Sequence, residues 1–232
     1  MKKVKLGISA ILMLVAMLLS DRAEIFVLYA LSAALHECGH FLAARILGIK
    51  ILEVRFDFSG IRICTEEKLM SYRNEFLLAA AGPIVNYVVI TVIAAFCSLD
   101  GISITEAAEA CVSFLFEGRY SHMGALCFVA LSSFLQLGIN LLPIRTFDGG
   151  RMTYCLSAVL FGERRAEQIL DVFSGFSAFV LWTVALYLML RISSGLGIYV
   201  FSVCLFLSTL KKSDLYKGQK RSEDILKIKA KI

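Results

Sequence analysis

The sequence predicts an all-α polytopic membrane protein with about six transmembrane helices and a small amphipathic β-hairpin at the cytoplasmic face. Of the 232 residues, 58% are hydrophobic and only 19% are charged, whereas soluble domains average about 25% charged residues. The apolar residues also gather in blocks that are long enough for a helix to cross a bilayer. One short segment alternates between apolar and polar residues, and this alternation predicts the hairpin.

The six predicted spans follow from the apolar blocks. They cover about residues 6–20, 25–47, 76–98, 122–142, 172–190 and 192–210, and a basic tail follows at 211–232. The first span, with its basic flank, is also similar to a secretory signal peptide. We expect a retained helix, because the residues SDRAE that follow it form a poor cleavage site for a signal peptidase.

The distribution of basic residues predicts the orientation of the spans. With the N-terminus inside, the inner segments hold 21 of the 24 Lys and Arg residues, and the outer segments hold only Arg22, Arg119 and Arg191. This bias predicts a multi-pass protein of the cell membrane with both termini in the cytoplasm. The net charge of +5 then reflects this topology and attraction to anionic lipid, so we expect no nucleic-acid partner. The outer segment 99–121 is acidic and half apolar and suggests no chemistry.

The motif HECGH, residues 36–40, places ionisable groups inside the second span. On a helix, His36 and His40 share one face and suit two ligands of one metal ion, while Glu37 beside them can act as a base on water. A chance match is a poor explanation, because a charged group within a span costs about 2.5–3.5 kcal/mol and is usually functional. Catalytic zinc needs a third protein ligand.

The segment NLLPIRTFDGGR, residues 140–151, is the candidate source of that third ligand. It follows the fourth span, which runs in the same direction as the second, so both emerge at the cytoplasmic side. Asp148 offers an oxygen ligand in a Gly-rich turn. The alternative is an ordinary turn, since Asp-Gly is a common turn dipeptide.

Three amide side chains within the predicted spans suggest a polar interior. Asn86 ends the segment AAGPIVN in the third span, and Gln136 and Asn140 lie on the fourth. Such residues either join helices through hydrogen bonds or contact a substrate. We leave both alternatives open for Asn86 and Asn140, and we favour helix–helix hydrogen bonding for Gln136.

The alternating segment EVRFDFSGIRIC, residues 53–64, predicts the amphipathic hairpin. Its strand with Phe56 and Phe58 could pair with an unwound substrate segment as an added strand. Alternatively, the hairpin only packs on the membrane surface.

Together, these motifs resemble the site-2 protease family of intramembrane zinc metalloproteases. HECGH followed by FLAA is similar to the family's HExGHxxxA, AGPIVN to its GPxxN element, and NLLPIRTFDGGR to its Asn-x-x-Pro…Asp-Gly segment. The resemblance covers about residues 25–160, and the six-span layout looks closest to the branch of bacterial sporulation-factor-processing proteases. Members of this branch often have proline where this chain has Thr146.

The resemblance implies roles for individual residues. His36, His40 and Asp148 would bind one zinc ion per chain, Glu37 would be the catalytic base, and Asn140 would position the substrate. Residues 1–210 would then form a single transmembrane protease domain with its metal-site core at about 25–160. The reaction would be peptide-bond hydrolysis within or near the transmembrane segment of a membrane-protein substrate, such as a transcription (sigma) factor precursor or an anti-sigma factor. Further expected partners are the lipid bilayer and a regulatory membrane protein.

Two other functions compete with proteolysis. A catalytically silent relative could bind and retain membrane partners, but it would have no use for Glu37 as a base. A metal transporter would need a continuous polar path, and the outer halves of the spans hold no ladder of acidic residues or histidines.

Overall fold

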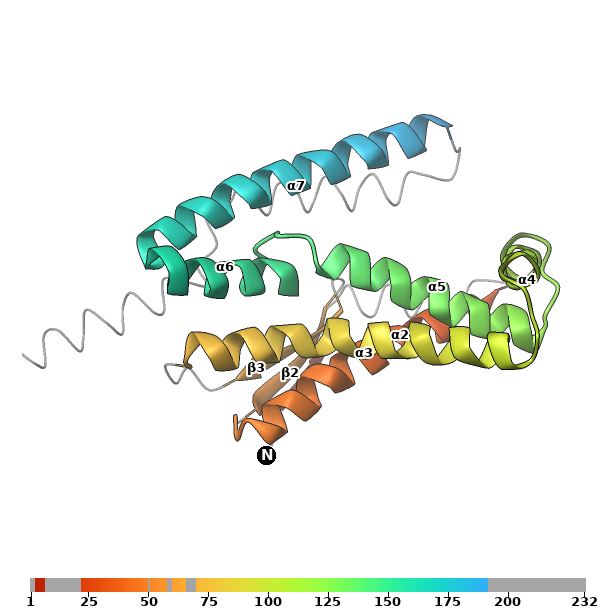
Figure 1. Cartoon of the computed structure of the whole chain (residues 1–232), viewed down its shortest axis with the longest axis horizontal. Coiled ribbons are helices and arrows are strands. Elements are labelled where there is room, and N and C mark those ends of the chain that lie inside the picture. Colours follow the sequence, from red (N-terminus) through yellow and green to blue (C-terminus); the bar gives the residue numbers. More distant parts are fainter. Residues whose placement is uncertain (1–2, 7–21, 50, 58–59, 66–69, 192–232) are drawn as a thin grey trace, which may run out of the picture. The chain divides into compact units, whose positions relative to one another are not determined.

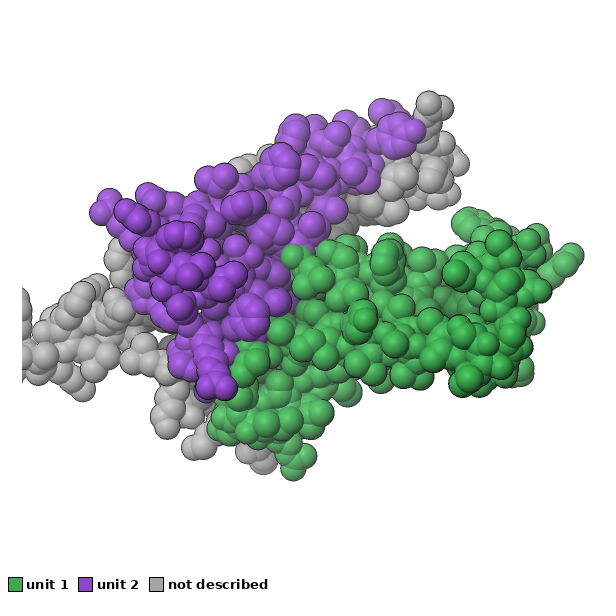
Figure 2. Space-filling view, viewed as in Figure 1, with its two compact units in different colours: residues 1–67, 77–141 green, residues 68–76, 142–232 purple. Residues whose placement is uncertain are grey.

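The computed structural model describes residues 3–6, 22–49, 51–57, 60–65 and 70–191 (Figure 1). Two compact units divide the chain, one formed by residues 1–67 and 77–141 and the other by residues 68–76 and 142–232 (Figure 2). Each unit packs around its own helices. The prediction of a single domain over 1–210 is not tested by this division and stays a prediction.

Six helices make up most of the described chain. They are α2 (Ala23–Ile46), α3 (Tyr72–Leu99), α4 (Ile104–Phe116), α5 (His122–Asn140), α6 (Asp148–Phe161) and α7 (Glu163–Arg191). Four of them are long and apolar enough to cross a membrane: α2, α3, α5 and the part of α7 over Glu163–Tyr187. These four coincide with the predicted spans 25–47, 76–98, 122–142 and 172–190. The predicted span 192–210, and all of the first span beyond its first residue, lie outside the described residues, so the six-span count stays a prediction.

The buried face of α2 consists of small and polar residues. They are Ser32, His36, Gly39, His40 and Ala44, spaced at helical intervals. By contrast, the apolar side chains of Val27, Leu31 and Leu42 are exposed. This pattern reverses that of a soluble helix and suits a helix surrounded by lipid. The histidines of HECGH therefore lie on the face that packs against the rest of the first unit.

A three-stranded sheet in the order β1–β2–β3 accompanies α2. Helix α2 ends at Ile46, and Gly48 follows its C-cap Leu47. The φ of 67° at Gly48 permits the hydrogen bond from Ile49 N–H to the Ala44 carbonyl that closes the last turn. Strand β2 (Ile51–Asp57) then pairs antiparallel with β3 (Gly60–Thr65) and parallel with β1 (Lys3–Leu6). The amphipathic character of this hairpin and its place at the cytoplasmic face stay predictions.

Helix α4 forms in segment 99–121, which was predicted to lie outside and for which the sequence suggested no chemistry. Its first turn is closed by a capping box, in which Ser103 Oγ accepts from Glu106 N–H and the Glu106 carboxylate accepts from Ser103 N–H at 2.8 Å. These hydrogen bonds lower the pKa of Glu106 below its usual value. The pattern Ser-x-x-Glu at 103–106 is a capping-box pattern, which indicates the N-terminus of a helix. Helix α4 was nevertheless not predicted.

Helices α2 and α5 run parallel within the first unit. Near their N-termini, Ile25 and Leu28 pack on a cluster that contains Ala125 and Phe128. Further along, Ser32 Oγ and Ser133 Oγ are hydrogen-bonded at 2.8 Å. This register, offset by about one hundred residues, sets the levels of the later residues on both helices.

The second unit is built from α6, α7 and the first turn of α3. Tyr154, Cys155 and Leu170 form a buried cluster against which Tyr72 and Phe76 pack. Burial, followed by the repulsion of nearby carboxylates such as Glu163, raises the pKa of the Tyr154 hydroxyl to about 12. This apolar cluster holds α6, and with it the start of that helix, against α7.

Candidate metal centre

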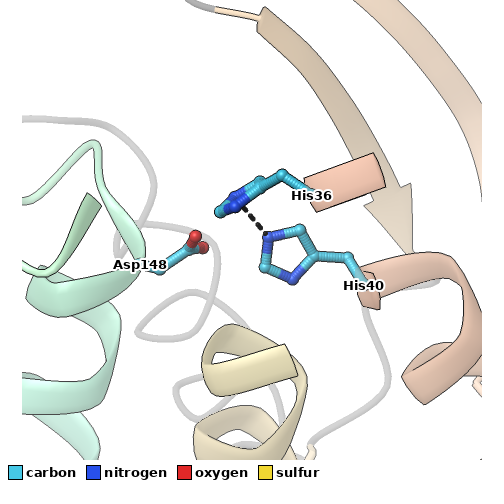
Figure 3. A group of neighbouring side chains, drawn as sticks. All are labelled: His36, His40 and Asp148. Carbon is cyan, nitrogen blue, oxygen red and sulfur yellow. Dashed lines mark hydrogen bonds between the residues drawn. The ribbon is translucent and has the colours of Figure 1, made fainter. Parts of the chain in front are cut away.

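His36 and His40 face each other on α2. Their Nε2 atoms lie 3.2 Å apart (Figure 3), and the two rings meet edge to face with centroids 4.9 Å apart. His36 is 5% exposed and His40 is 9% exposed. The helical spacing predicted from the sequence therefore brings two buried nitrogen atoms to one point.

Helix α3 holds the outer nitrogens of both rings. His40 Nδ1 lies 2.8 Å from the Leu78 carbonyl oxygen, and His36 Nδ1 lies 3.1 Å from Asn86 Nδ2. A carbonyl oxygen can only accept, so His40 donates through Nδ1–H and, as a neutral ring, keeps an unprotonated Nε2. These contacts fix the plane of each imidazole. Leu78 entered no sequence prediction, because a backbone carbonyl carries no sequence signal.

Two glycines allow this close approach of α2 and α3. A Cβ built on Gly82 would overlap His40 Nε2 and would lie 2.6 Å from His36 Nε2. A Cβ on Gly39 would lie 2.5 Å from the Ala81 carbonyl oxygen and 2.8 Å from Val85 Cγ2. Any side chain at either position would push the helices apart or displace the rings. Gly82 is thus part of the site.

The histidine pair fits a zinc ion. Two ligands at about 2.0–2.1 Å from a tetrahedral zinc ion lie about 3.3 Å apart, close to the 3.2 Å between the Nε2 atoms. Metal-bound imidazoles also donate their second N–H to a carbonyl, carboxylate or water. His40 already meets this requirement through Leu78.

Glu37 is half-buried and follows His36 on α2. A step of one residue turns the helix by about 100°, so its carboxylate projects beside the histidine face rather than along it. Asn86 is fully buried, in direct contact with His36. Gln136 Nε2 has no hydrogen-bond partner among the described residues, whereas a residue that joins helices would need one.

Asp148 is the first residue of α6, in the second unit, and is half-buried. The loop before it is tied to α7, because Arg145 pairs with Asp171 and its backbone N–H donates to Ser174 Oγ at 3.2 Å. A Cβ on Gly150 would overlap the Ile144 carbonyl oxygen, so the turn into α6 is tight. The sequence predicted a Gly-rich turn around Asp148, but Gly149 and Gly150 lie in the first turn of α6 and neither has a positive φ. The anchoring by Arg145 was not predicted.

Phe56 and Phe58 of the hairpin were predicted to contact the substrate. Phe56 belongs to β2, which is the central strand of the sheet, and residue 58, Phe58, lies outside the described residues. An added strand would pair with an outer strand, β1 or β3, because both edges of β2 are occupied. The strand carrying Phe56 is therefore not a free edge.

The chain is similar to known metalloproteases. A family model described as peptidase family M50 matches residues 24–184. A zinc metalloprotease of Methanocaldococcus jannaschii is 24% identical over 148 residues, which are 63% of this chain and 38% of that protein, so the chain matches less than half of that relative's length. A solved structure of a site-2 protease from Methanocaldococcus jannaschii superimposes with a TM-score of 0.58 at 22% identity, covering 90% of each chain. This likeness concerns the fold.

Proposed function

This chain belongs to peptidase family M50, and we propose on that basis that it is an intramembrane zinc metalloprotease. One observation of the molecule carries the proposal, namely the two buried imidazole nitrogens that face each other 3.2 Å apart. The similar proteins, a zinc metalloprotease and a site-2 protease, support this proposal.

His36, His40 and Asp148 would hold the zinc ion, one per chain. Each would supply one ligand atom, and three protein ligands would leave a position open for chemistry. The anchored loop that presents Asp148 suits a ligand that must keep its place. Zinc, when bound, is a Lewis acid that polarises a peptide carbonyl and makes water a better nucleophile near neutral pH.

Glu37 would be the general base. Its carboxylate accepts a proton from the attacking water and later returns it to the leaving amine. Asn140, at the C-terminal end of α5, would donate a hydrogen bond that positions the substrate. Asn86 acts on the substrate only through His36, because its amide contacts that ring.

The substrate would be a membrane protein whose transmembrane segment unwinds at the site, since a helix hides its carbonyls in its own hydrogen bonds. A sigma factor precursor or an anti-sigma factor, as in the sporulation-factor branch, fits this class. The excess of basic residues in the predicted inner segments places both termini, and the site at the inner half of α2, toward the cytoplasm.

Zinc content and cleavage test this proposal. Detergent-purified wild-type protein should hold about one zinc per chain, and Asp148→Ala should lose most of it. Wild type should also cleave tagged single-span sigma factor precursors or anti-sigma factors from the same cell, while Glu37→Gln keeps zinc but not cleavage. A folded wild type without zinc would overturn the proposal, and full zinc in Asp148→Ala would assign the third ligand elsewhere.

A further inference from the structure

Helix α4 connects the end of α3 with the start of α5 and lies across the ends of both helices. Figure 1 shows α4 along its own axis, whereas α3 and α5 run across the same view. Helices α4 and α5, and α3 from Leu77 onward, belong to the first unit. Both α3 and α5 are long and apolar enough to cross a membrane. A helix that lies across their ends therefore runs close to the membrane surface.

The side chains of α4 fall into three stripes. One stripe is buried, and its members Cys111 and Phe114 form a cluster with Ala125 and Phe128 of α5. A second stripe is apolar and exposed, and its members are four residues apart and so share one helix face; they are Ile104, Ala108, Val112 and Phe116. A third stripe is polar and consists of Glu106, Glu109, Ser113 and Glu117. At 100° per residue, the three stripes point about 120° apart.

This division suits a helix at the place where protein, lipid and water meet. In the apolar stripe, Ile104 is 90% exposed and Phe116 is 81% exposed, and contact of such side chains with water is unfavourable. The exposed apolar surface of α3 leads up to the stripe, because Phe96 and Leu99 near the end of that helix are also exposed. A surface that faces lipid along a span thus continues onto α4. This continuity favours the bilayer as the partner of the apolar stripe.

Arg22 ties the last turn of α4 to the start of α2. It is the N-cap residue of α2, and its guanidinium donates to the carbonyls of Phe114 and, at 3.2 Å, of Leu115. The guanidinium also lies over the Phe114 ring, 5.8 Å from its centroid. The last carbonyls of a helix have no partner within that helix, and a cation beside them is favourable. The level of α4 is therefore also the level at which α2 begins.

We propose that α4 is an interfacial helix that lies in the membrane surface. Its apolar stripe is buried at the boundary between lipid headgroups and acyl chains, and its polar stripe faces water. The helix holds no Lys or Arg, so apolar contact rather than attraction to anionic lipid keeps it there. Through Arg22 it also sets the depth of α2. At 1.5 Å per residue, His36 lies about 21 Å further along α2 than Arg22, in the far half of a hydrocarbon core about 30 Å thick.

Tryptophan fluorescence in lipid vesicles tests the two exposed stripes. The full-length chain is reconstituted in phosphatidylcholine, and Trp182, its only tryptophan, is replaced by phenylalanine. Val112→Trp then reports on the apolar stripe. Ser113→Trp is the matched control, because neighbouring residues of a helix point about 100° apart. Lipids brominated near the headgroup end of their acyl chains should quench at least about half of the Val112→Trp emission and little of the Ser113→Trp emission.

Equal quenching of these two variants would overturn the inference, and so would the absence of quenching in Val112→Trp. In the second case, a blue-shifted emission maximum would identify a second copy of the chain or another protein as the partner of the stripe. A red-shifted maximum would show that the stripe faces water. Where Val112→Trp does not fold, Phe116→Trp replaces it with the same expected result.

The depth of α2 is the second test. Leu31 is exposed on α2 and lies about 14 Å further along the helix than Arg22. Leu31→Trp, in the same Trp182→Phe background, should be quenched most by bromine near the ends of the acyl chains, whereas Val112→Trp should be quenched most by bromine near the headgroups. The same depth for both residues would overturn the placement of α4 at the surface.

The link through Arg22 is tested in the same way. In Arg22→Ala, the emission of Leu31→Trp should be quenched over a wider range of depths, and an unchanged depth profile would overturn the link. Zinc does not enter any of these measurements. A failure of the proposed protease function would therefore leave them unchanged, and the two failures are distinct.

Discussion

The two units hold their proposed metal ligands by different means. In the first unit, His36 and His40 are fixed where two helix backbones meet at a glycine, and buried hydrogen bonds hold their outer nitrogens. In the second unit, Asp148 stands at the start of a helix after a loop, and an ion pair at a half-exposed carboxylate ties that loop to α7.

Side chains in the first unit are thus held more rigidly than the loop before Asp148 in the second. Among lipid tails, helices associate through close packing of small residues and hydrogen bonds. At Gly39 the contact is with the backbone carbonyl of Ala81, and at Gly82 it is with two buried imidazole rings whose outer nitrogens are held by hydrogen bonds, so neither contact has much room to relax. The loop before Asp148 is held to α7 by the side chains of Asp171 and Ser174, so it can move slightly and keep these contacts. Substitutions in the first unit should therefore cost more than comparable substitutions in the second.

Gly82→Ala should have the largest effect. The added methyl group meets both Nε2 atoms, so the rings must move, and zinc affinity should fall by at least about 10–100-fold. Gly138→Ala on α5 is the matched control, since a Cβ there meets nothing within 4 Å. Chelator competition on both variants checks this, and near-normal zinc binding by Gly82→Ala would show that the crossing is not rigid.

Gly150→Ala should have a smaller effect on the same measurement. Its methyl group overlaps the Ile144 carbonyl, but the loop can yield, and we expect about tenfold weaker zinc binding. Gly175→Ala in α7 is its control, because that position is open. If Gly150→Ala proved more damaging than Gly82→Ala, the contrast in rigidity between the two units would be reversed.

Asp171→Ala tests the anchor of the loop. The Arg145 side chain is 8% exposed and its partner Asp171 is 51% exposed, so solvent screens the pair and its loss should cost about 1 kcal/mol of unfolding free energy. Thermal unfolding in detergent measures this cost. The exposed pair of Arg119 and Glu117 is the comparison, and Glu117→Ala should leave the melting temperature unchanged. If Asp171→Ala and Glu117→Ala had the same melting temperature, the ion pair between Arg145 and Asp171 would not anchor the loop.

Ser103→Ala should have the smallest effect on the metal site. It removes the N-cap of α4 at a cost of about 1 kcal/mol, and zinc binding should stay normal because α4 carries no ligand. The pKa of Glu106 is lowered in the folded chain, so its stabilising contribution is complete above the ordinary glutamate pKa and is lost as the pH falls through the lowered value. Melting curves at descending pH should show this loss in wild type but not in Glu106→Gln.

Sequence patterns predicted much of the fold and the core of the site. The apolar blocks at 25–47, 76–98, 122–142 and 172–190 all became helices, because length and hydropathy alone decide whether a segment can span lipid. The spacing of His36 and His40 fixed their shared face, since helical geometry is local. Helix α4 was not predicted, although the sequence contains its capping box. The pairing of β1 with β2 was not predicted either, because it joins segments about fifty residues apart.

The sequence by itself therefore determined which residues could bind a metal and which segments could cross a membrane, because both depend on residue type and local spacing. Only the tertiary structure decided what holds them in place. Gly82 lies next to both imidazoles, and Leu78 and Asn86 contact their outer nitrogen atoms. Arg145 anchors the loop before Asp148 to α7. Each of these contacts joins residues that are far apart in the sequence. No local pattern encodes such contacts, because they depend on how helices cross and in which register.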